Sequence, residues 1–311
     1  MQKLFALLFA LLAAPALAQP SLKMMIPANP GGGWDQTGRS LAAAMQSAKL
    51  VSGVQFENKG GAAGIIGLAQ FANAARGDPN AVMIGGMVMA GGIILGKSQV
   101  NLSQVTPIAR LTSEWEVVVV PAASPLKTMA DVVKLLKENP GKVSWGGGSA
   151  GGTDHILAGL IARAVGVDAS KVNYVAYKGG GEAIAAILGG HVTVGVSGIG
   201  EFAEQVKAGK MRALAQSGPA RVDGIPTLKE QGIDVELGNW RGIFGAPGIT
   251  PQQRDALVKL VKDATETPAW KATLEKLGWT GVFLGGEDYH RFIDEDTKRV
   301  GAIIESLGLK K

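Results

Sequence analysis

Three segments of this chain repeat one pattern, in which a short apolar strand leads into a glycine-rich turn and then a helix. They are MMIPANPGGGWD (24–35), VSWGGGSAGGTDH (143–155) and NYVAYKGGGEA (173–183). A glycine-rich turn at a helix start leaves backbone N–H groups free, and the helix dipole adds roughly half a positive charge there. Several such turns facing one cleft predict a binding site for a carboxylate, a phosphate or another anion.

Strands and helices alternate along the chain, which predicts an α/β fold with mainly parallel sheets flanked by helices. We expect strands at 22–27, 54–58, 81–85, 116–121, 142–145, 172–177, 191–197, 211–216 and 240–247. We expect helices at about 35–50, 64–75, 128–139, 153–165, 182–189, 200–208, 251–267, 268–277 and 287–307. The segment 87–92 is expected to be one more glycine-rich turn.

The length of 311 residues exceeds the comfortable size of a single core, so we expect two lobes. Two segments, 116–121 and 240–247, look like strands that are closed by a proline and followed by a helix. They would serve as hinge strands, with crossings near 117–121 and 238–244. Lobe 1 would hold 19–118 plus 241–311, with the C-terminal helices covering it, and lobe 2 would hold 119–240.

The N-terminus looks like a secretory signal peptide, 1–18. Lys3 gives a cationic start, residues 4–14 are apolar, and Ala16-Leu17-Ala18 is a typical cleavage site before Gln19. No later segment has the ~20 consecutive apolar residues that a membrane-spanning helix needs. Export of a chain with no cysteine fits a bacterial periplasm. We therefore expect a soluble periplasmic protein.

Composition and motifs argue against several other functions. The formal charge of +5 is mild, and no basic run with interleaved aromatics predicts nucleic-acid binding. Three histidines without a cysteine make a zinc site improbable. The chain has no GxxxxGK[ST] loop, no dinucleotide fingerprint and no GxSxG elbow. We expect a monomer that is not an enzyme and holds no cofactor or metal.

The motifs resemble those of the periplasmic substrate-binding receptors of tripartite tricarboxylate transporters, often called the Bug family. The matching stretches are Pro30–Asp35 with Arg39, 57–64, 139–142, 148–155, 177–181, 208–214, 225–228 with Glu230 and Gly232, and Trp240 with Ala246-Pro247. They span nearly the whole mature chain in the family's order. The resemblance implies a two-lobed, type 2 periplasmic-binding-protein fold (a Venus flytrap), small carboxylate ligands and a partnership with two integral membrane transporter subunits.

In the family, one ligand carboxylate sits in the loop after the first strand. Here, the resemblance and the exposed amides together assign a set of candidates in lobe 1: Pro30, Gly31, Gly32, Gly33, Trp34, Asp35, Gly61, Ala62 and Met87. Asp35 is placed as the N-cap of the following helix, either capping only or orienting the loop amides or a water toward the ligand. Trp34 either walls the pocket or packs in the core.

The second carboxylate loop of the family matches residues of lobe 2. The candidates there and in the returning hinge strand are Ser149, Gly151, Gly152, Thr153, Asp154, Tyr177, Lys178, Gly179, Gly180, Ser197 and Arg241. Thr153 offers a hydroxyl donor and a free helix-start amide, and Asp154 also has a structural role with the helix dipole. Arg241, if it points inward, would pair bidentately with a carboxylate. His155 is interpreted as structural rather than catalytic.

These observations predict a receptor that captures a dicarboxylate or tricarboxylate, such as citrate or a C4 acid, between its lobes. Delivery to a membrane transporter is the expected purpose. The alternative is an exported carboxylate sensor of the same fold that feeds a signalling receptor, and an enzyme is a distant third. Ligand identity and the choice between transport and signalling are left open by the sequence.

Overall fold

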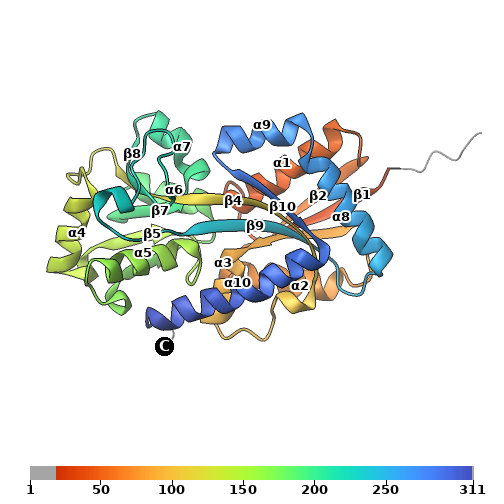
Figure 1. The fold of residues 1–311 in the computed structure, drawn as a ribbon, viewed down its shortest axis with the longest axis horizontal. Helices are drawn as coiled ribbons and strands as arrows, with labels where there is room; N and C mark the ends of the chain where they lie inside the picture. Colours follow the sequence, from red (N-terminus) through yellow and green to blue (C-terminus); the bar gives the residue numbers. More distant parts are fainter. Residues whose placement is uncertain (1–18, 310–311) are drawn as a thin grey trace, which may run out of the picture.

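The computed structural model describes residues 19–309, so the expected signal peptide, 1–18, lies outside the described residues. Two lobes lie side by side along the long axis of the molecule, and β4 (Thr106–Pro121) and β9 (Gly238–Gly245) run along the region where they meet (Figure 1). Within 19–309, no helix is long and apolar enough to cross a membrane. The predicted two-lobed α/β architecture is thus present.

The first lobe is built on a mixed sheet with a parallel part of three strands. These strands are β2 (Gly53–Asn58), β1 (Ser21–Ile26) and β3 (Ala81–Gly86), in that order. β9 lies antiparallel to β3, β4 lies antiparallel to β9, and β10 (Thr280–Gly285) pairs antiparallel with β4. The strands β9, β4 and β10 therefore form the antiparallel side of this sheet.

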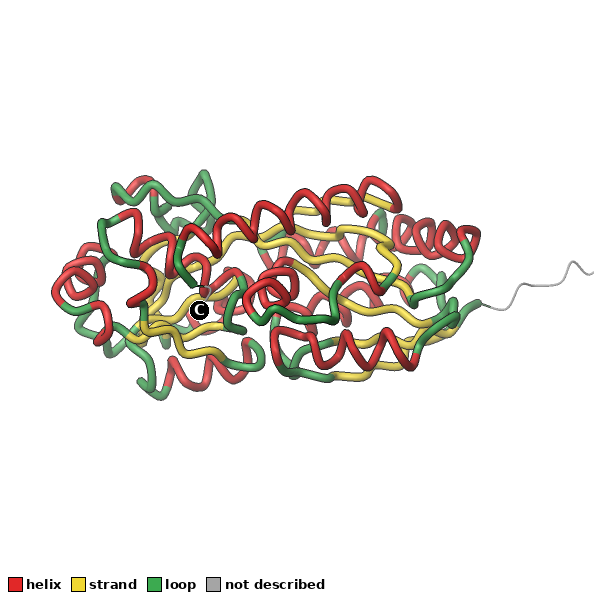
Figure 2. The backbone as a smooth tube through the Cα atoms, turned by 90° about the horizontal axis from the view of Figure 1, so that it is seen from below, coloured by secondary structure: helices red, strands yellow, loops and turns green. Residues whose placement is uncertain are grey.

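Helices cover both faces of this sheet (Figure 2). On one face lie α1 (Gly33–Ser47), α8 (Pro251–Thr265) and α9 (Pro268–Leu277). On the other lie α2 (Ile65–Ala74), α3 (Met87–Leu95) and α10 (Gly286–Ser306). Coverage on both sides explains why the central strand β3 is apolar and buried along its whole length.

The second lobe repeats the plan on a smaller scale. Its parallel strands are β6 (Asn173–Ala176), β5 (Ser144–Gly147) and β7 (Val194–Gly198). β4 pairs antiparallel with β7, and β8 (Met211–Gln216) pairs antiparallel with β4. The helices are α4 (Met129–Glu138), α5 (Thr153–Ala164), α6 (Gly180–Leu188) and α7 (Ile199–Lys207).

One strand, β4, belongs to both sheets. Trp115 pairs with Gly238 in the first sheet, and the next residue, Glu116, pairs with Gly198 in the second. β4 begins at Thr106, ten residues before the strand that the sequence predicted, because polar residues interrupt the apolar ones in its first half without a regular period. The strand β10 was not predicted.

The segment 87–92 is a helix and not the predicted turn. It forms the start of α3, which follows β3 directly. Its glycines serve close packing: a Cβ on Gly91 would overlap the carbonyl oxygen of Gly151 in the second lobe, and one on Gly92 would overlap Ala63. These glycines do not mark a turn, because their close packing against Gly151 and Ala63 cannot be read from local sequence.

Helix α10 covers the first lobe as expected but also reaches the second. Its 21 residues span roughly 31 Å at 1.5 Å per residue, and its C-terminal end lies beneath α5 (Figure 1). Arg163 of α5 donates a hydrogen bond from Nη1 to Ser306 Oγ over 2.7 Å. Leu307, just after the helix, is buried against Gly159 of α5. A third connection, besides the two long strands, thus ties the lobes together.

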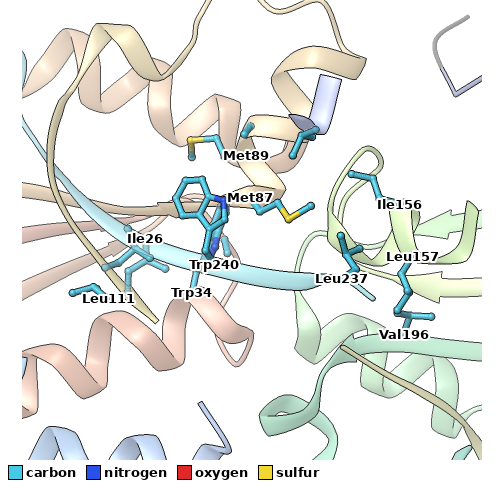
Figure 3. Packing of buried hydrophobic residues seen from close by; sticks show 14 of the residues in the cluster. Ile26, Trp34, Met87, Met89, Leu111, Ile156, Leu157, Val196, Leu237 and Trp240 are labelled. Atoms are coloured by element: carbon cyan, nitrogen blue, oxygen red, sulfur yellow. The ribbon is translucent and has the colours of Figure 1, made fainter. Parts of the chain in front are cut away.

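A continuous apolar core runs through both lobes. Figure 3 shows Trp34, Met87, Met89 and Trp240 gathered around β9, with Leu237 leading toward the second lobe. A smaller cluster lies on the other side of the second sheet and includes Val117, Ile187 and Phe202. The site described next lies between the two halves of this core.

Candidate ligand-binding site

A small cavity lies between the lobes, where the glycine-rich turns meet. Its lining comes from both lobes and from β9: Pro27, Ala28, Gly32, Gly33, Trp34, Ala63, Gly64, Val88, Gly148, Ser149, Asp154, Lys178, Gly179, Gly180, Ser197, Glu201, Asn239 and Arg241. The cavity holds about 70 Å³. The lobes are closed on each other in this structure, because Asn29 of the first lobe donates to Glu182 of the second over 2.6 Å.

The first glycine turn is held by Asp35, although not in the predicted way. Helix α1 begins at Gly33 with Gly32 as its N-cap, so Asp35 is the third helical residue and not the cap. Its carboxylate accepts hydrogen bonds from the Gly31 N–H (3.1 Å), Arg39 Nε (2.9 Å) and Asn58 Nδ2 (3.0 Å). Burial acts to raise the pKa of Asp35, but these hydrogen bonds outweigh it and lower the pKa. Asp35 holds the loop in place through these hydrogen bonds and does not line the cavity.

The other two turns are held in the same way. Asp154, near the start of α5, accepts a hydrogen bond from the Gly148 N–H over 2.5 Å. Glu182, the third residue of α6, accepts one from the Lys178 N–H over 3.1 Å. An acid near the start of each helix therefore reaches back to an amide of its own turn. These hydrogen bonds fix the conformation of the turns, but the acids that accept them bring no positive charge to the site.

Arg241 is the cation at the centre of the site. Its side chain is 2% exposed, and Nη2 donates to Glu114 of β4 and to Glu201 of α7. Its Nε and Nη1 have no hydrogen-bond partner among the described residues, and neither has the buried Oδ1 of Asn239. Arg241 thus points inward, and part of its guanidinium is free to bind a further group.

Four carboxyl groups lie close to one another here, and Arg241 contacts two of them, Glu114 and Glu201. The four are Glu114, Glu116, Asp154 and Glu201, and each is buried at its carboxyl end. Burial raises the pKa of each of them; Asp154 and Glu114 raise that of Glu116 further, while Arg241 lowers that of Glu114. The pKa of Glu201 reaches about 7. Several of these groups therefore hold their protons at a pH where an exposed carboxyl has lost its own.

His155 supports a loop. Its Nδ1 accepts a hydrogen bond from the Gly151 N–H over 3.0 Å, and its ring stacks on Tyr174 with the centroids 4.4 Å apart. Burial lowers its pKa to about 4, so the ring is neutral near pH 7. This arrangement matches the structural interpretation of His155. The described residues 19–309 contain no group of histidine and acidic side chains suited to hold a metal ion.

Half of the residues predicted from sequence line the cavity. They are Gly32, Gly33, Trp34, Ser149, Asp154, Lys178, Gly179, Gly180, Ser197 and Arg241. Ala62 and Tyr177 line a second interlobe cavity of about 340 Å³, which shares Ala63, Ser149 and Lys178 with the first. The two cavities together form one cleft at the contact between the lobes.

The other predicted residues line neither cavity: Pro30, Gly31, Asp35, Gly61, Met87, Gly151, Gly152 and Thr153. Met87 is fully buried in the core. Thr153 begins α5 as expected, and its buried hydroxyl has no hydrogen-bond partner among the described residues. Gly31 and Gly151 act in the supporting hydrogen bonds described above. These residues shape the turns from behind.

Of the four acids, sequence reasoning named Asp154 and missed Glu114, Glu116 and Glu201. Glu114 and Glu116 flank Trp115 immediately before the most apolar part of β4, and charged residues at the edge of such a run are a usable signal of a buried polar site. Glu201 also had a signal, because it follows Gly198 and Gly200 as the third residue of α7. The remaining missed residues are Pro27, Ala28, Ala63, Gly64, Val88, Gly148 and Asn239.

This fold and site define a two-lobed solute-binding protein with a polar cleft between its lobes. The sequence profile of the tripartite tricarboxylate transporter family receptor matches residues 38–309. The chain therefore belongs to this receptor family. Members of the family are solute-binding receptors, and the chain is accordingly a receptor and not an enzyme.

Two curated relatives agree with this assignment. A Cupriavidus necator protein, described as a UPF0065 protein in the gbd 5' region, is 31% identical over 97% of this chain and 93% of its own. BugT of Bordetella pertussis is 25% identical over 93% of this chain and 90% of its own. The similarity thus extends over the full fold.

Solved structures show the same fold. The periplasmic binding protein BugD matches with a TM-score of 0.83 and 24% identity, covering 94% of this chain and 99% of its own. MatC of Rhodopseudomonas palustris, solved with bound malate, matches with a TM-score of 0.76 and 20% identity over 94% and 99%. A second R. palustris protein, solved with adipate, matches with a TM-score of 0.83 and 19% identity over 93% and 97%.

Proposed function

We propose that this chain is a periplasmic receptor that captures a small dicarboxylate or tricarboxylate in the interlobe cleft and delivers it to a membrane transporter of two integral subunits. One observation carries the proposal. The starts of α1 and α6, one from each lobe, line the same cavity as the partly unpartnered Arg241. Helix-start amides and a guanidinium are the groups that bind carboxylates best in proteins.

The comparisons support the ligand class. Malate and adipate, each with two carboxylates, are bound by proteins of the same fold. We further propose that the chain is exported, that residues 1–18 are removed, and that the mature protein acts as a monomer. An exported sensor of the same fold remains the second candidate, because the cleft would capture the ligand in the same way for either purpose.

A thermal-shift screen tests capture. Protein refolded after removal of bound ligand would be heated with monocarboxylates, dicarboxylates and tricarboxylates, with malate, adipate and citrate among them. A ligand at ~100 times its dissociation constant should add ~2.7 kcal/mol to the free energy of unfolding. No response across this panel, with amino acids or sugars responding instead, would refute the proposal. Uptake of the responding acid by cells lacking the chain then separates transport from signalling.

A further inference from the structure

Glu201 occupies an exceptional position among the acids of the cleft. It is the third residue of α7, as Asp35 is of α1 and Glu182 is of α6. Asp35 and Glu182 bend back to an amide of their own turn. Glu182 also accepts a hydrogen bond from Asn29 of the first lobe. Glu201 differs from both because its carboxylate contacts the guanidinium of Arg241 and not an amide of its own turn. The same local pattern therefore serves a different purpose in α7.

The partners of Glu201 are those expected of a ligand carboxylate. Its Oε1 lies 3.1 Å from Nη2 of Arg241. The Gly33 N–H at the start of α1 is close enough to act to lower the pKa of this carboxyl, and a Cβ on Gly33 would overlap Oε1. Gly180 lies so close that a Cβ there would overlap Oε2. The Glu201 side chain is 7% exposed. A carboxylate of the protein itself thus fills the anion position at the α1 start.

The charges around this position disfavour a second anion. Glu201 faces Arg241 on β9, Glu114 and Glu116 on β4, and Asp154 on α5. Lys178 lines the same cavity but is exposed. An incoming carboxylate beside an ionised Glu201 would add a like charge in a water-poor site, where repulsion is strong. The unpartnered Nε and Nη1 of Arg241 nevertheless show that the site has binding capacity left.

We infer that Glu201 is an internal carboxylate that occupies the anion position made by the Gly33 N–H and Arg241, holds the empty cleft shut, and must be displaced or protonated before a ligand carboxylate binds there. The inference rests on the proposed function for its ligand. Glu201 is then a specificity-determining residue, because it sets the pH range and the strength of carboxylate capture. Its pKa of about 7 is consistent with such an exchange near neutral pH.

The binding test compares the wild type with Glu201→Gln, which keeps the shape and removes the charge. Malate, adipate and citrate would be titrated by calorimetry at pH 6 and pH 8. Wild-type affinity should fall about tenfold from pH 6 to pH 8, since one proton must be taken up by a group with a pKa near 7. Glu201→Gln should bind about tenfold more tightly than the wild type at pH 8 and show no such pH dependence.

The matched control is Glu204→Gln, an exposed acid one turn along the same helix. It removes the same charge from α7 and should behave like the wild type. Equal tightening in both variants would assign the effect to general charge. Weaker binding in Glu201→Gln would mean that Glu201 contacts a cationic part of the ligand. Either result would overturn the inference.

A measurement without ligand distinguishes the inference about Glu201 from the proposed function. Small-angle scattering of Glu201→Ala should give a larger radius of gyration than the wild type, because the contact with Gly33 and Arg241 is lost. An unchanged radius overturns the inference, whatever the ligand experiments show. If no acid of the panel binds the wild type, the proposed function fails while the scattering result still decides the role of Glu201.

Discussion

Arg241 is the residue on which the stability of the site depends. Its guanidinium, 2% exposed, is the cation beside Glu114 and Glu201, and two further acids lie nearby. Removing one partner of a buried ion pair leaves the other charge uncompensated, which typically costs 3–5 kcal/mol. The acids can escape that cost by taking up protons, because burial has already raised their pKa values.

We therefore expect Arg241→Met to lower the free energy of unfolding by about 3–5 kcal/mol at pH 8 and by clearly less at pH 5. Urea unfolding followed by circular dichroism at both pH values measures this. Arg39→Met, which removes an exposed partner of Asp35, is the control and should cost about 1 kcal/mol or less. An equal loss at both pH values would show that the buried acids stay ionised without Arg241.

The pH dependence of the wild type follows from Glu201. Its pKa is raised from 4.5 to about 7, so between these values the native state holds a proton that the unfolded state has lost. The free energy of unfolding from this group therefore falls as pH rises from 4.5 to 7 and levels off above. His155, whose pKa is lowered to about 4, acts in the opposite direction over much of this window. Subtracting the curve of Glu201→Gln, measured by urea unfolding, isolates the Glu201 contribution, and a flat difference would contradict the assignment.

At the scale of elements, glycines inside helices occur for different reasons, and Gly91 of α3 can be compared directly with Gly301 of α10. In α3, a Cβ on Gly91 would overlap the Gly151 carbonyl of the second lobe. In α10, a Cβ on Gly301 would meet only Ile94, at an ordinary 3.8 Å. Gly91 is therefore required by the contact between lobes, whereas Gly301 only lowers the helix propensity of α10.

Gly301→Ala should raise the free energy of unfolding by about 0.5–1 kcal/mol, because alanine loses less backbone entropy in a helix. Gly91→Ala should lower it by about 1–3 kcal/mol through overpacking. Thermal and urea unfolding of both variants measure the effects. The same sign for both would mean that the approach of α3 to the second lobe is looser in solution.

At the scale of the whole molecule, closure brings the glycine turns of the two lobes into contact. A Cβ on Gly32 would lie 2.9 Å from the backbone nitrogen of Gly180, which is tighter than a real side chain tolerates. Asn29 of the first lobe also donates to Glu182 of the second over 2.6 Å. A ligand that bridges these turns gains contacts only in the closed state and so adds to the stability of that state.

Gly32→Val should prevent full closure and weaken carboxylate binding by more than Lys178→Ala does. The reason is that the turn binds through its backbone, whereas Lys178 is exposed at the rim. Calorimetry measures affinity, and scattering with saturating diacid measures closure, which should be complete only in the lysine variant. A greater loss in Lys178→Ala would favour an ordinary ion pair as the source of affinity.

The sequence by itself determined the repeated strand–turn–helix units, the two-lobed α/β plan and the family, because each depends on short-range patterns. Gly32, Gly180 and Arg241 could be assigned to the site for the same reason, since helix starts and an arginine in a returning strand are local features. The tertiary structure decided what surrounds them. Glu114 and Arg241 are 127 residues apart, and Glu201 and Arg241 are 40 apart. Such contacts depend on how the two lobes pack across the hinge. The hydrophobic periods of 2 and 3.6 residues indicate strands and helices but carry no information on that packing.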